Sequence, residues 1–480
     1  MSKHAVQQEF AKRRLHFIGI GGAGMSGLAQ VAMELGARVT GSDASESVYT
    51  ELLRKRGIDP LIGHSADQLP ADAEAVVSTA ISTDNPELKI AHDRDQRVLH
   101  RGELLAQIAA LKSCIAVVGT HGKTTTASMV AHCLIELGLD PAFVIGGQLR
   151  GSGSNAQWGA GKWIVVEADE SDGSFLRLRP TVAALTNLEL DHHARYSSLV
   201  ELEECCRQFL AAVPGDGTAV TWNRPELTTL LPTDRSTLRY DAQLHNLPGQ
   251  QPQPGAAESA EPPYLYAAEV SFTRLGSRFQ LLRDGKLLTE VTIAVPGTHN
   301  VLNALAALAI LEAADIDLVT GAAALASFNG SERRFEPKGS YNGAEIFDDY
   351  AHHPTEVRVT LETARRLNPK RLVVVFQPHL YSRTLYLARD FGRALALADE
   401  VVVLDVYPAR ERPIGELAGV SGKLVVDAVA DQAPGRAVWW LPTQGEAVAY
   451  LRSELREGDV VMTVGAGDVD LVGQELVRST

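Results

Sequence analysis

The stretch SCIAVVGTHGKTTTASMVAHCLIELG, residues 113–138, decides how the centre of the chain folds. Its apolar beginning, residues 113–119, predicts a buried strand. Apolar residues then recur at helical spacing from Met129 to Leu137, and Gly138 is a signal for the end of a helix. A strand, a glycine-containing turn and a helix in this order predict one unit of a parallel α/β sheet.

The turn in this stretch, GTHGKTTT (Gly119–Thr126), has the chemistry of a phosphate-binding loop. Its glycines allow backbone N–H groups to approach an anion, Lys123 supplies a cation for β- and γ-phosphates, and Thr124 or Thr125 can reach Mg²⁺. Position 117 is Val rather than Gly, so the match to the Walker pattern is incomplete. A chance Gly-Lys-Thr turn is the alternative, but the flanking strand and helix favour a site for a nucleoside triphosphate.

A second glycine loop lies upstream in GIGGAG (Gly19–Gly24), between a strand expected at 15–20 and a helix expected at 26–35. It matches G-x-G-x-x-G, and Asp43 follows about 20 residues further on, at the end of the next expected strand. Glycines here let backbone N–H groups approach a diphosphate at a helix N-terminus. The pattern favours a diphosphate-bearing nucleotide, either a dinucleotide or a UDP-sugar, over a tight turn without a ligand.

Acidic residues follow two further expected strands of the central region. EADESD (Glu167–Asp172) ends one strand, and TNLELDHH (Thr186–His193) follows the next. Strand ends beside a phosphate loop are where Mg²⁺ needs oxygen ligands. Glu167 lies inside the strand run and is the favoured ligand, whereas the other three acids of EADESD are equally consistent with solvated or capping side chains. His192 is a less usual ligand type for Mg²⁺.

The next two motifs carry less specific signals. In PGTHNVLNALAAL, the side chains of His299, Asn300 and Asn303 stand at an expected helix start. Capping and packing are the plain interpretation of such residues, and contact with a nucleobase is the sharper one. In GSERRFE, Arg333 and Arg334 have the charge to pair with phosphate or to bridge two domains.

The last third contains DDYAHHPTE (348–356) and QPHLYSRT (377–384), which follow expected strands and concentrate aromatic and basic groups. Ligands of open α/β sheets bind just beyond the carboxyl ends of the strands. The set therefore favours a ligand site, although a solvated surface explains any single member equally well. Its members are Tyr350, His352, His353, His379, Tyr381 and Arg383.

The length of 480 residues suggests about three domains at roughly 100–200 residues each. The strand and helix runs place the expected domains at 1–110, 111–328 and 329–480. With 45 basic and 59 acidic residues the net charge is −14, which argues against a nucleic-acid or anionic-membrane binder. No apolar run approaches the roughly 20 residues needed to span a bilayer. The sequence carries no signal for an oligomeric state.

The N-terminal residues and the cysteines favour a cytoplasmic protein. The first residues, MSKHAVQQEFAKRR, are polar and lack the apolar region of a signal peptide. The four cysteines have neither disulfide nor zinc spacing, and two of them, Cys205 and Cys206, are expected to pack near a core face. Residues 241–263, rich in Pro, Gln, Gly and Ala, predict a mobile loop or insertion, and 277–295 predicts a hairpin around Asp284-Gly285.

Taken together, and in this order over nearly the whole chain, the motifs resemble the Mur ligase family, the ATP-dependent amide ligases of peptidoglycan precursor synthesis. The resemblance implies an α/β fold of three domains: an N-terminal Rossmann-like domain, a central P-loop ATPase-like parallel sheet and a C-terminal Rossmann-like domain. It implies UDP-N-acetylmuramate, L-alanine and ATP as substrates and Mg²⁺ as cofactor. The implied reaction joins alanine to the lactyl carboxylate through an acyl phosphate. A family member that adds a recycled tripeptide instead is the nearest alternative.

The resemblance also implies a role for individual residues. ATP would be held by the phosphate loop and by two asparagines near the adenine (Gly119, Thr120, His121, Gly122, Lys123, Thr124, Thr125, Asn300 and Asn303). The UDP part of the substrate would contact Gly19, Gly21, Gly22, Gly24, Asp43, His64 and Arg101. The metal ligands would be Thr124, Glu167 and His192. Alanine and the muramyl group would contact Tyr350, His352, His379 and Arg383. The catalytic groups would be Lys123, His192, Arg334 and His352.

Two positions depart from the family pattern. No lysine occurs between Asp191 and Pro214, so a carbamylated lysine, as some relatives use near the metal, is not expected there. Leu380 stands where a basic residue is expected, which puts a substrate contact from that position in doubt.

Two alternatives come from other classes of protein. A dehydrogenase could use GIGGAG and Asp43 for NAD, but it would leave GTHGKTTT and EADESD without a role. A regulatory or scaffold protein could bind ATP on GTHGKTTT without forming a bond.

Overall fold

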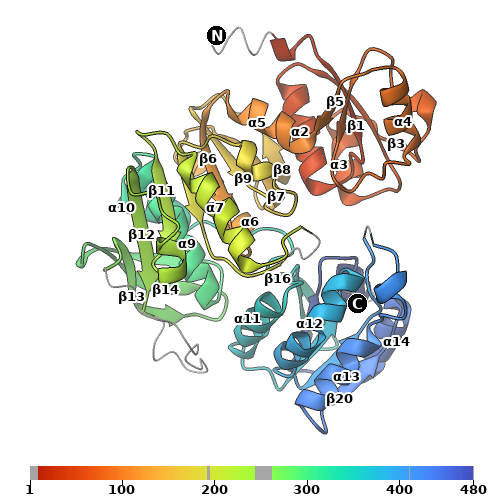
Figure 1. Ribbon diagram of the computed structural model, residues 1–480. Helices are drawn as coiled ribbons and strands as arrows, with labels where there is room; N and C mark the ends of the chain where they lie inside the picture. Colours follow the sequence, from red (N-terminus) through yellow and green to blue (C-terminus); the bar gives the residue numbers. More distant parts are fainter. Residues whose placement is uncertain (1–8, 192–194, 244–261, 410, 479–480) are drawn as a thin grey trace.

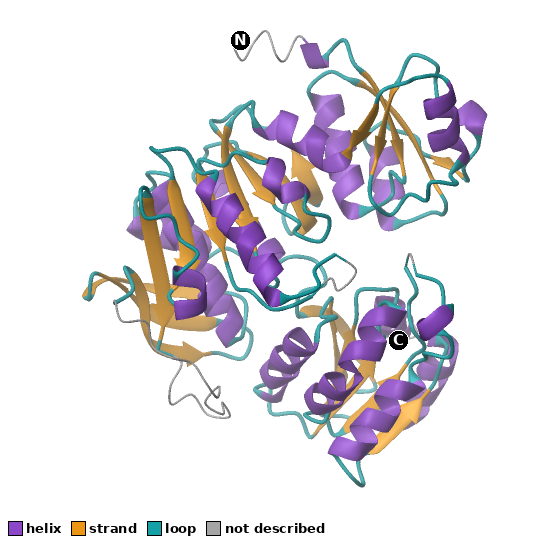
Figure 2. Ribbon diagram, viewed as in Figure 1, coloured by secondary structure: helices purple, strands orange, loops and turns teal. Residues whose placement is uncertain are grey.

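The computed structural model describes residues 9–191, 195–243, 262–409 and 411–478. Its strands form three separate sheets, which follow one another along the chain (Figure 1). Helices flank each sheet, as expected for parallel α/β units (Figure 2). The expected three-domain α/β architecture is confirmed, whereas the boundaries at 110 and 328 stay predictions. In the described part of the chain, no helix combines the length and apolarity needed to cross a membrane.

The N-terminal sheet is fully parallel, with strand order β3-β2-β1-β4-β5. The expected strand and helix around GIGGAG are both present, as β1 and α2. The strands are β1 (Arg14–Ile18), β2 (Arg38–Asp43), β3 (Leu61–Ile62), β4 (Glu74–Val77) and β5 (Val98–His100). The helices are α2 (Ala23–Glu34), α3 (Val48–Lys55), α4 (Pro86–Asp93) and α5 (Arg101–Ala109).

The central sheet has ten strands in the order β15-β14-β13-β12-β11-β10-β6-β9-β7-β8. Its middle is parallel, and antiparallel strands lie at both edges. The strands are β6 (Ser113–Val118), β7 (Ala142–Leu149), β8 (Ser154–Gln157), β9 (Trp163–Glu167), β10 (Val182–Leu185), β11 (Thr218–Trp222), β12 (Ser236–Ala242), β13 (Leu265–Phe272), β14 (Ser277–Arg283) and β15 (Lys286–Ile293). The helices are α6 (Lys123–Glu136), α7 (Leu199–Ala211), α8 (Pro225–Thr228), α9 (Thr298–Ala313) and α10 (Leu318–Leu325).

Two expectations for the central domain have different outcomes. The hairpin is confirmed as β14–β15, and both turn residues have positive φ, 48° at Asp284 and 73° at Gly285, as a two-residue type I′ turn requires. The expected loop at 241–263 falls mainly on 244–261, which lie outside the described residues. Residues 241 and 242 end strand β12 instead of belonging to the loop.

The C-terminal sheet has six strands in the order β16-β17-β21-β18-β19-β20, and only the edge strand β16 is antiparallel to its neighbour. The strands are β16 (Glu336–Tyr341), β17 (Ala344–Asp349), β18 (Arg371–Phe376), β19 (Glu400–Val403), β20 (Ala437–Trp440) and β21 (Asp459–Val464). The helices are α11 (Pro354–Arg365), α12 (Tyr381–Leu395), α13 (Lys423–Gln432), α14 (Gln444–Glu454) and α15 (Asp470–Arg478).

One continuous apolar core joins the N-terminal and central domains. Buried residues between Phe10 and Leu230, from both domains, belong to the same cluster. At the junction, Gln30 in α2 donates a hydrogen bond to the carbonyl of Ala156 in β8, with Nε2 and O 2.6 Å apart. A Cβ atom at Gly102 in α5 would collide with the side chain of Ser174 in the 3₁₀ helix 174–177. The two domains therefore meet as closely as elements within one domain.

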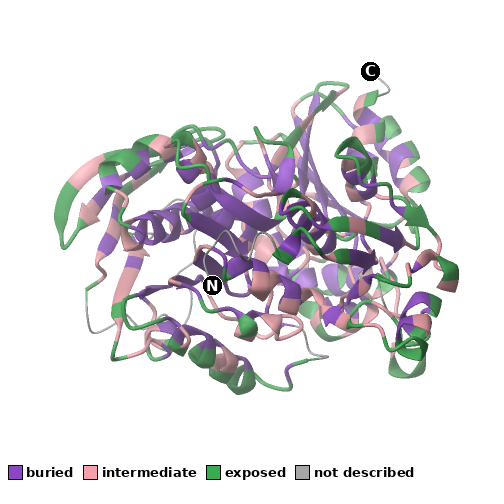
Figure 3. Ribbon diagram, turned by 90° about the horizontal axis from the view of Figure 1, so that it is seen from above, coloured by how far each residue is buried: buried purple, intermediate pink, exposed green. Residues whose placement is uncertain are grey.

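The C-terminal domain has its own core. Its buried apolar side chains form two clusters, one on each face of the sheet, and neither contains a residue that precedes Phe335. Figure 3 shows buried strands in the interior of the molecule and exposed positions on helices and loops at its periphery. In the described ranges, charged and polar pairs join this domain to the central one, among them Arg383 with Asp191, His121 with Glu356 and Arg274 with Glu345.

Candidate active site

The phosphate loop lies between the carboxyl end of β6 and the first turn of α6. Gly122 is the N-cap residue of α6, with φ 78°, and no side chain caps the helix. A Cβ atom at Gly122 would collide with Asn303, and one at Gly119, whose φ is 134°, would collide with Thr186. Only glycine fits these positions. The backbone N–H groups at the start of α6 are therefore available to an anion.

Lys123 lies over this loop and beside an acidic group. Its Nζ donates hydrogen bonds to the carbonyl oxygen of Gly119 at 2.5 Å and to Glu170 Oε1 at 2.9 Å. Burial alone would lower the pKa of Lys123, but Glu170 and the nearby Asp169 raise it above its ordinary value. The ammonium group is therefore charged at neutral pH, as phosphate binding requires.

An oxygen pair suited to Mg²⁺ lies next to the loop. Thr124 Oγ1 donates to Glu167 Oε1 at 2.9 Å, and the N–H of Gly146 donates to Glu167 Oε2 at 2.6 Å. Burial raises the pKa of Glu167 above its ordinary value, although Lys123 acts in the opposite direction. A hydroxyl and a carboxylate are the hard ligands that Mg²⁺ prefers, so these residues fit that ion. The third predicted ligand, His192, lies outside the described residues.

The two asparagines at the start of α9 lie against the same loop. Asn303 Nδ2 donates to Asn300 Oδ1 at 3.2 Å, and Asn300 Nδ2 donates to the carbonyl oxygen of Pro296 at 2.7 Å. Thr126 Oγ1 lies 3.4 Å from Asn303 Oδ1. Both asparagines are buried, so capping and packing account for the contacts that the structure records. Their predicted place near an adenine stays a prediction.

The GIGGAG loop stands at the carboxyl end of β1, where Asp43 supports it. The N–H of Gly21 donates to Asp43 Oδ2 at 2.8 Å, and a Cβ atom at Gly21 would lie 2.9 Å from the same oxygen. Gly22 is the N-cap residue of α2, and again no side chain caps the helix. His64 lies further away in a network with Ser42 and Glu87, with Nδ1 2.8 Å from Glu87 Oε1.

Arg101 connects the GIGGAG loop with the EADESD motif. Its Nη2 donates to Asp169 Oδ2 at 2.6 Å and to Asp172 Oδ2 at 2.8 Å, and a Cβ atom at Gly24 would lie 2.9 Å from its Nη1. The residue predicted to contact UDP therefore also links the first domain to the second. Asp169, Asp172 and Glu170 are all ion-paired, and the side chains of Glu170 and Asp172 are buried, so a solvated role for these two is wrong. The side chain of Asp169 remains 38% exposed, and Asp169 and Asp172 also accept hydrogen bonds from the backbone N–H groups of Ser171 and Ser174.

The aromatic and basic residues of the C-terminal domain form one cluster. His352 and His379 lie 6.0 Å apart between ring centroids, and Tyr350 lies 5.5 Å from His352. Arg383 Nη1 is 3.3 Å from His379 Nδ1. Burial lowers the pKa of His352 to about 4, although Glu356 acts in the opposite direction. The ring of His352 is therefore neutral at pH 7.

The two neighbouring arginines have different surroundings. Arg333 is used within its own domain, because its Nε donates to Asp348 Oδ2 at 2.9 Å and its other nitrogens donate to the carbonyls of Gly465 and Gly467. Both arginines lie over the ring of Tyr350, Arg333 at 5.1 Å and Arg334 at 5.4 Å from its centroid. Burial raises the pKa of Glu167 in the central domain, and the charge of Arg334 opposes this rise. The role of Arg334 in phosphate binding stays a prediction.

Tyr49 in α3 of the N-terminal domain is affected by charges of the C-terminal domain. Burial, with Tyr350 and Glu332 nearby, raises the pKa of Tyr49 well above its ordinary value. Sequence reasoning missed Tyr49, because a tyrosine in an amphipathic helix carries no functional signal of its own.

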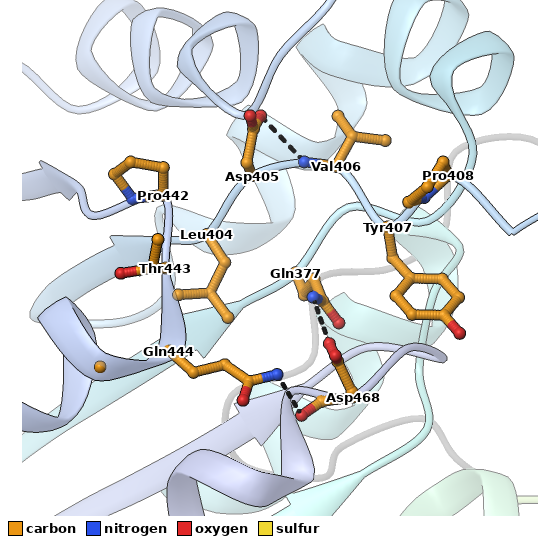
Figure 4. Close-up of a pocket in the computed structure, with 11 residues that line it drawn as sticks. Gln377, Leu404, Asp405, Val406, Tyr407, Pro408, Pro442, Thr443, Gln444 and Asp468 are labelled. Carbon is orange, nitrogen blue, oxygen red and sulfur yellow. Dashed lines mark hydrogen bonds between the residues drawn. The ribbon is translucent and has the colours of Figure 1, made fainter. Parts of the chain in front are cut away.

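A cavity of about 590 Å³ opens beside the cluster, beyond the carboxyl ends of β18, β19 and β21 (Figure 4). Gln377 Nε2 donates to Asp468 Oδ1 across its floor at 2.7 Å. Tyr407, in its wall, stacks on His379 with ring centroids 5.7 Å apart and planes tilted by 12°. The cavity thus shares a wall with the cluster of predicted alanine contacts, at the strand ends where open α/β sheets bind ligands.

Leu380, the second departure from the family pattern, lies between these features. Its φ is 74°, its N–H donates to the carbonyl of Tyr407 at 3.0 Å, and its side chain is buried. The side chain packs into the protein.

Comparison with known proteins agrees with this arrangement. The chain matches three family models in succession: Mur ligase family, catalytic domain (residues 14–113); Mur ligase middle domain (residues 117–311); and Mur ligase, glutamate ligase domain (residues 333–467). The fold and the matches define a ligase of three domains that uses ATP. The chain belongs to the Mur ligase family, and the predicted family is confirmed.

Individual relatives cover nearly the whole chain. A UDP-N-acetylmuramate–L-alanine ligase of Pelotomaculum thermopropionicum is 43% identical over 470 residues, which covers 97% of each chain. The crystal structure of a UDP-N-acetylmuramate–alanine ligase from Thermotoga maritima is 30% identical with a TM-score of 0.81, covering 97% of this chain and 98% of that one. A murein peptide ligase from Psychrobacter arcticus is 24% identical with a TM-score of 0.73, at the same coverage, and therefore shares the fold.

Proposed function

We propose that this protein joins L-alanine to the lactyl carboxylate of UDP-N-acetylmuramate in the synthesis of peptidoglycan precursors, with ATP converted to ADP and phosphate. The observation that carries the proposal is the meeting of motifs from all three domains at one phosphate loop. Arg101 connects the GIGGAG loop to EADESD, and Glu356 connects the cluster around His352 to His121. The identity to alanine-adding relatives selects this reaction within the family. Cell-wall growth, cell shape and cell division depend on such a reaction, which we assign to the cytoplasm.

Each substrate has a proposed place. UDP would bind at the N-terminus of α2, where no side chain caps the helix, with Asp43, His64 and Arg101 as further contacts. ATP would bind the N-terminus of α6 through its phosphates and Lys123 through its charge. Thr124 and Glu167 would hold Mg²⁺, which supplies positive charge to the phosphates when it is bound. Alanine and the muramyl group would contact the residues of the C-terminal cluster.

The proposed reaction proceeds in two steps. The lactyl carboxylate attacks the γ-phosphorus of ATP in line, and ADP leaves. Lys123 and Arg334 stabilise the negative charge on the transferred phosphoryl group. The neutral amine of alanine then attacks the acyl phosphate, a C–N bond forms, and phosphate leaves with the electron pair of the broken C–O bond. One proton is released from the amine.

His352 has a defined part in this scheme. Because its ring is neutral at pH 7, a ring nitrogen can accept a hydrogen bond from an N–H of the attacking neutral amine. Its pKa of about 4 makes the ring a weak base, so it orients the amine rather than storing the proton. An acyl phosphate would hydrolyse in water, so the reaction requires that water be excluded from the site.

One assay tests the proposal most directly. ADP release is measured with UDP-N-acetylmuramate and, in parallel, L-alanine, glycine, L-serine or the recycled tripeptide. We expect L-alanine to give the highest kcat/KM, by about 1–3 kcal/mol over glycine for the missing methyl group. A preference for the tripeptide would assign the chain to the other branch of the family. ADP release when UDP-N-acetylmuramate and the amino acid are both left out would indicate an ATPase that forms no amide bond.

A further inference from the structure

The carboxylate of Glu356, at the start of α11, has two sets of partners in two domains. Within its own domain, Oε2 accepts the N–H of His352 at 3.0 Å and of His353 at 3.4 Å. Towards the central domain, Oε1 lies 3.1 Å from Nδ1 of His121 in the phosphate loop. Its side chain is only 13% exposed. One carboxylate thus touches the segment that carries the cluster and the loop that holds ATP.

The first set of contacts belongs to a capping box. His353 is the N-cap residue of α11, and Glu356 is the third helical residue, whose side chain reaches back to the N-cap N–H. Such a box stabilises a helix start but needs only one carboxylate oxygen. The same domain offers a comparison in α14, where Thr443 and Glu446 form a capping box on the exposed surface. Capping of α11 therefore does not require the contact between Glu356 and His121 of the central domain.

The partner of this contact, His121, is held so that its ring must point out of the loop. The N–H of His121 donates to Asn187 Oδ1 at 2.8 Å, and its carbonyl accepts from Thr186 Oγ1 at 2.7 Å. Its second ring nitrogen, Nε2, lies 3.2 Å from Glu189 Oε2, which also accepts from Thr355 Oγ1 at 2.7 Å. The ring is therefore clamped between carboxylates of the central and C-terminal domains.

We propose that Glu356 is a positioning residue that couples the phosphate loop to the amino-acid cluster, through His121 on one side and the backbone of His352 on the other. Closure of the C-terminal domain then orders the loop for ATP and places His352 for alanine in one event. Binding of either substrate stabilises the arrangement that the other needs. This inference rests on the proposed function for the identity of the second substrate, but not for the coupling to nucleotide.

The test compares Glu356→Gln with Glu446→Gln. A glutamine keeps the oxygen that a capping box needs and removes the charge that faces His121. We measure the Kd of a non-hydrolysable ATP analogue by calorimetry, and KM and kcat with L-alanine. Glu356→Gln should weaken analogue binding and raise KM for alanine, each by about tenfold, as expected for loss of a charge-assisted hydrogen bond. Glu446→Gln should change neither by more than about twofold, as expected for a surface residue.

A double-mutant cycle with His121→Asn completes the test. If the two side chains act as a unit, Glu356→Gln should cost little once His121 has been replaced. The coupling is refuted if Glu356→Gln binds the analogue like Glu446→Gln, or if the two single effects add in full. The analogue measurement needs neither alanine nor turnover, so it decides the coupling even if the chain ligates another acceptor. Absence of alanine ligation in the unaltered protein would count against the proposed function alone.

Discussion

Arg383, in α12 of the C-terminal domain, donates hydrogen bonds to both carboxylate oxygens of Asp191 in the central domain, with Nη2 3.0 Å from Oδ2 and 3.1 Å from Oδ1. The side chains are 5% and 8% exposed. Arg383 also lies beside His379 of the cluster. The residue predicted to contact alanine or the muramyl group therefore also joins two domains.

Replacing Arg383 by Ala should destabilise the protein and impair ligation. Loss of one partner from a buried ion pair typically costs about 3–5 kcal/mol, because the remaining charge is desolvated. Denaturant unfolding of the variant measures this cost. Arg393→Ala is the control, since Arg393 pairs with Asp390 on the exposed surface of the same helix and should cost less than about 1 kcal/mol. Equal stabilities of the two variants would contradict the role of the interdomain pair.

Replacing Lys123 by Ala should abolish ATP-dependent ligation and leave binding of UDP-N-acetylmuramate largely intact. Lys123 is the cation over the phosphate loop, and the UDP site is expected in another domain. ADP release measures the first effect and calorimetry with the UDP substrate measures the second. The matched control is Lys423→Ala, because Lys423 is exposed and pairs only within its own helix with Asp427 in the described structure. Retained turnover in the Lys123→Ala variant would contradict the assignment of ATP binding to the central domain.

Replacing Gly21 by Val should raise KM for the UDP substrate, with a smaller effect on KM for ATP. A Cβ atom there would lie 2.9 Å from both Asp43 Oδ2 and Thr50 Cγ2, so the loop has to shift. Steady-state kinetics with each substrate varied in turn measure the two constants. Gly215→Val is the control, because no atom lies within 4 Å of its added Cβ. An unchanged KM for the UDP substrate would contradict a role of the GIGGAG loop in diphosphate binding.

Replacing Glu167 by Gln should raise the Mg²⁺ concentration that supports half-maximal ligation by at least about tenfold. The amide keeps an oxygen for Thr124 or the metal but loses the negative charge that a divalent cation needs. Titration of activity with Mg²⁺ after removal of metal by a chelator gives this concentration. Glu204→Gln, on the exposed face of α7, should leave it unchanged. The same Mg²⁺ requirement in both variants would exclude Glu167 as a ligand.

The contact between the central and C-terminal domains should weaken at alkaline pH. Burial alone would lower the pKa of His121, but Glu189 and Glu356 raise it to about 9. Because the folded pKa is above the ordinary value of 6.5, the stabilisation is fully present below pH 6.5 and is lost as the pH rises through 9. Unfolding measured from pH 6 to 10 should show this loss, and His121→Asn should reduce it. A pH dependence that survives the substitution must come from other groups.

The sequence predicts those parts of the site that are contiguous along the chain. GTHGKTTT specifies its own strand, turn and helix, so Lys123 and Thr124 could be assigned before the fold was known. Glu167 is predicted as a metal ligand because it lies at the end of an apolar strand run, which leaves a local pattern. The structure then places that strand, β9, next to β6. The order of three α/β units could be predicted for the same reason.

The partners of these residues could not be predicted, because they come from distant segments. Arg383 and Asp191 are 192 positions apart, and His121 and Glu356 are 235 apart. The spacing of apolar residues along the chain carries no information about which strand ends face each other across a domain boundary. Glu356 had only a weak local signal, the spacing of a capping box with histidine in place of the usual Ser or Thr.

The apolar core shared by the first two domains has a consequence for how the chain reaches its native state. During synthesis, Phe10, near the N-terminus, belongs to a core that is complete only when the chain has been made as far as Leu230. The other face of the central sheet is covered by residues as far as Phe328. The first two domains should therefore become protease-resistant together and unfold as one unit. The C-terminal domain, with its separate core, can fold on its own. In calorimetry we expect two transitions from these three domains.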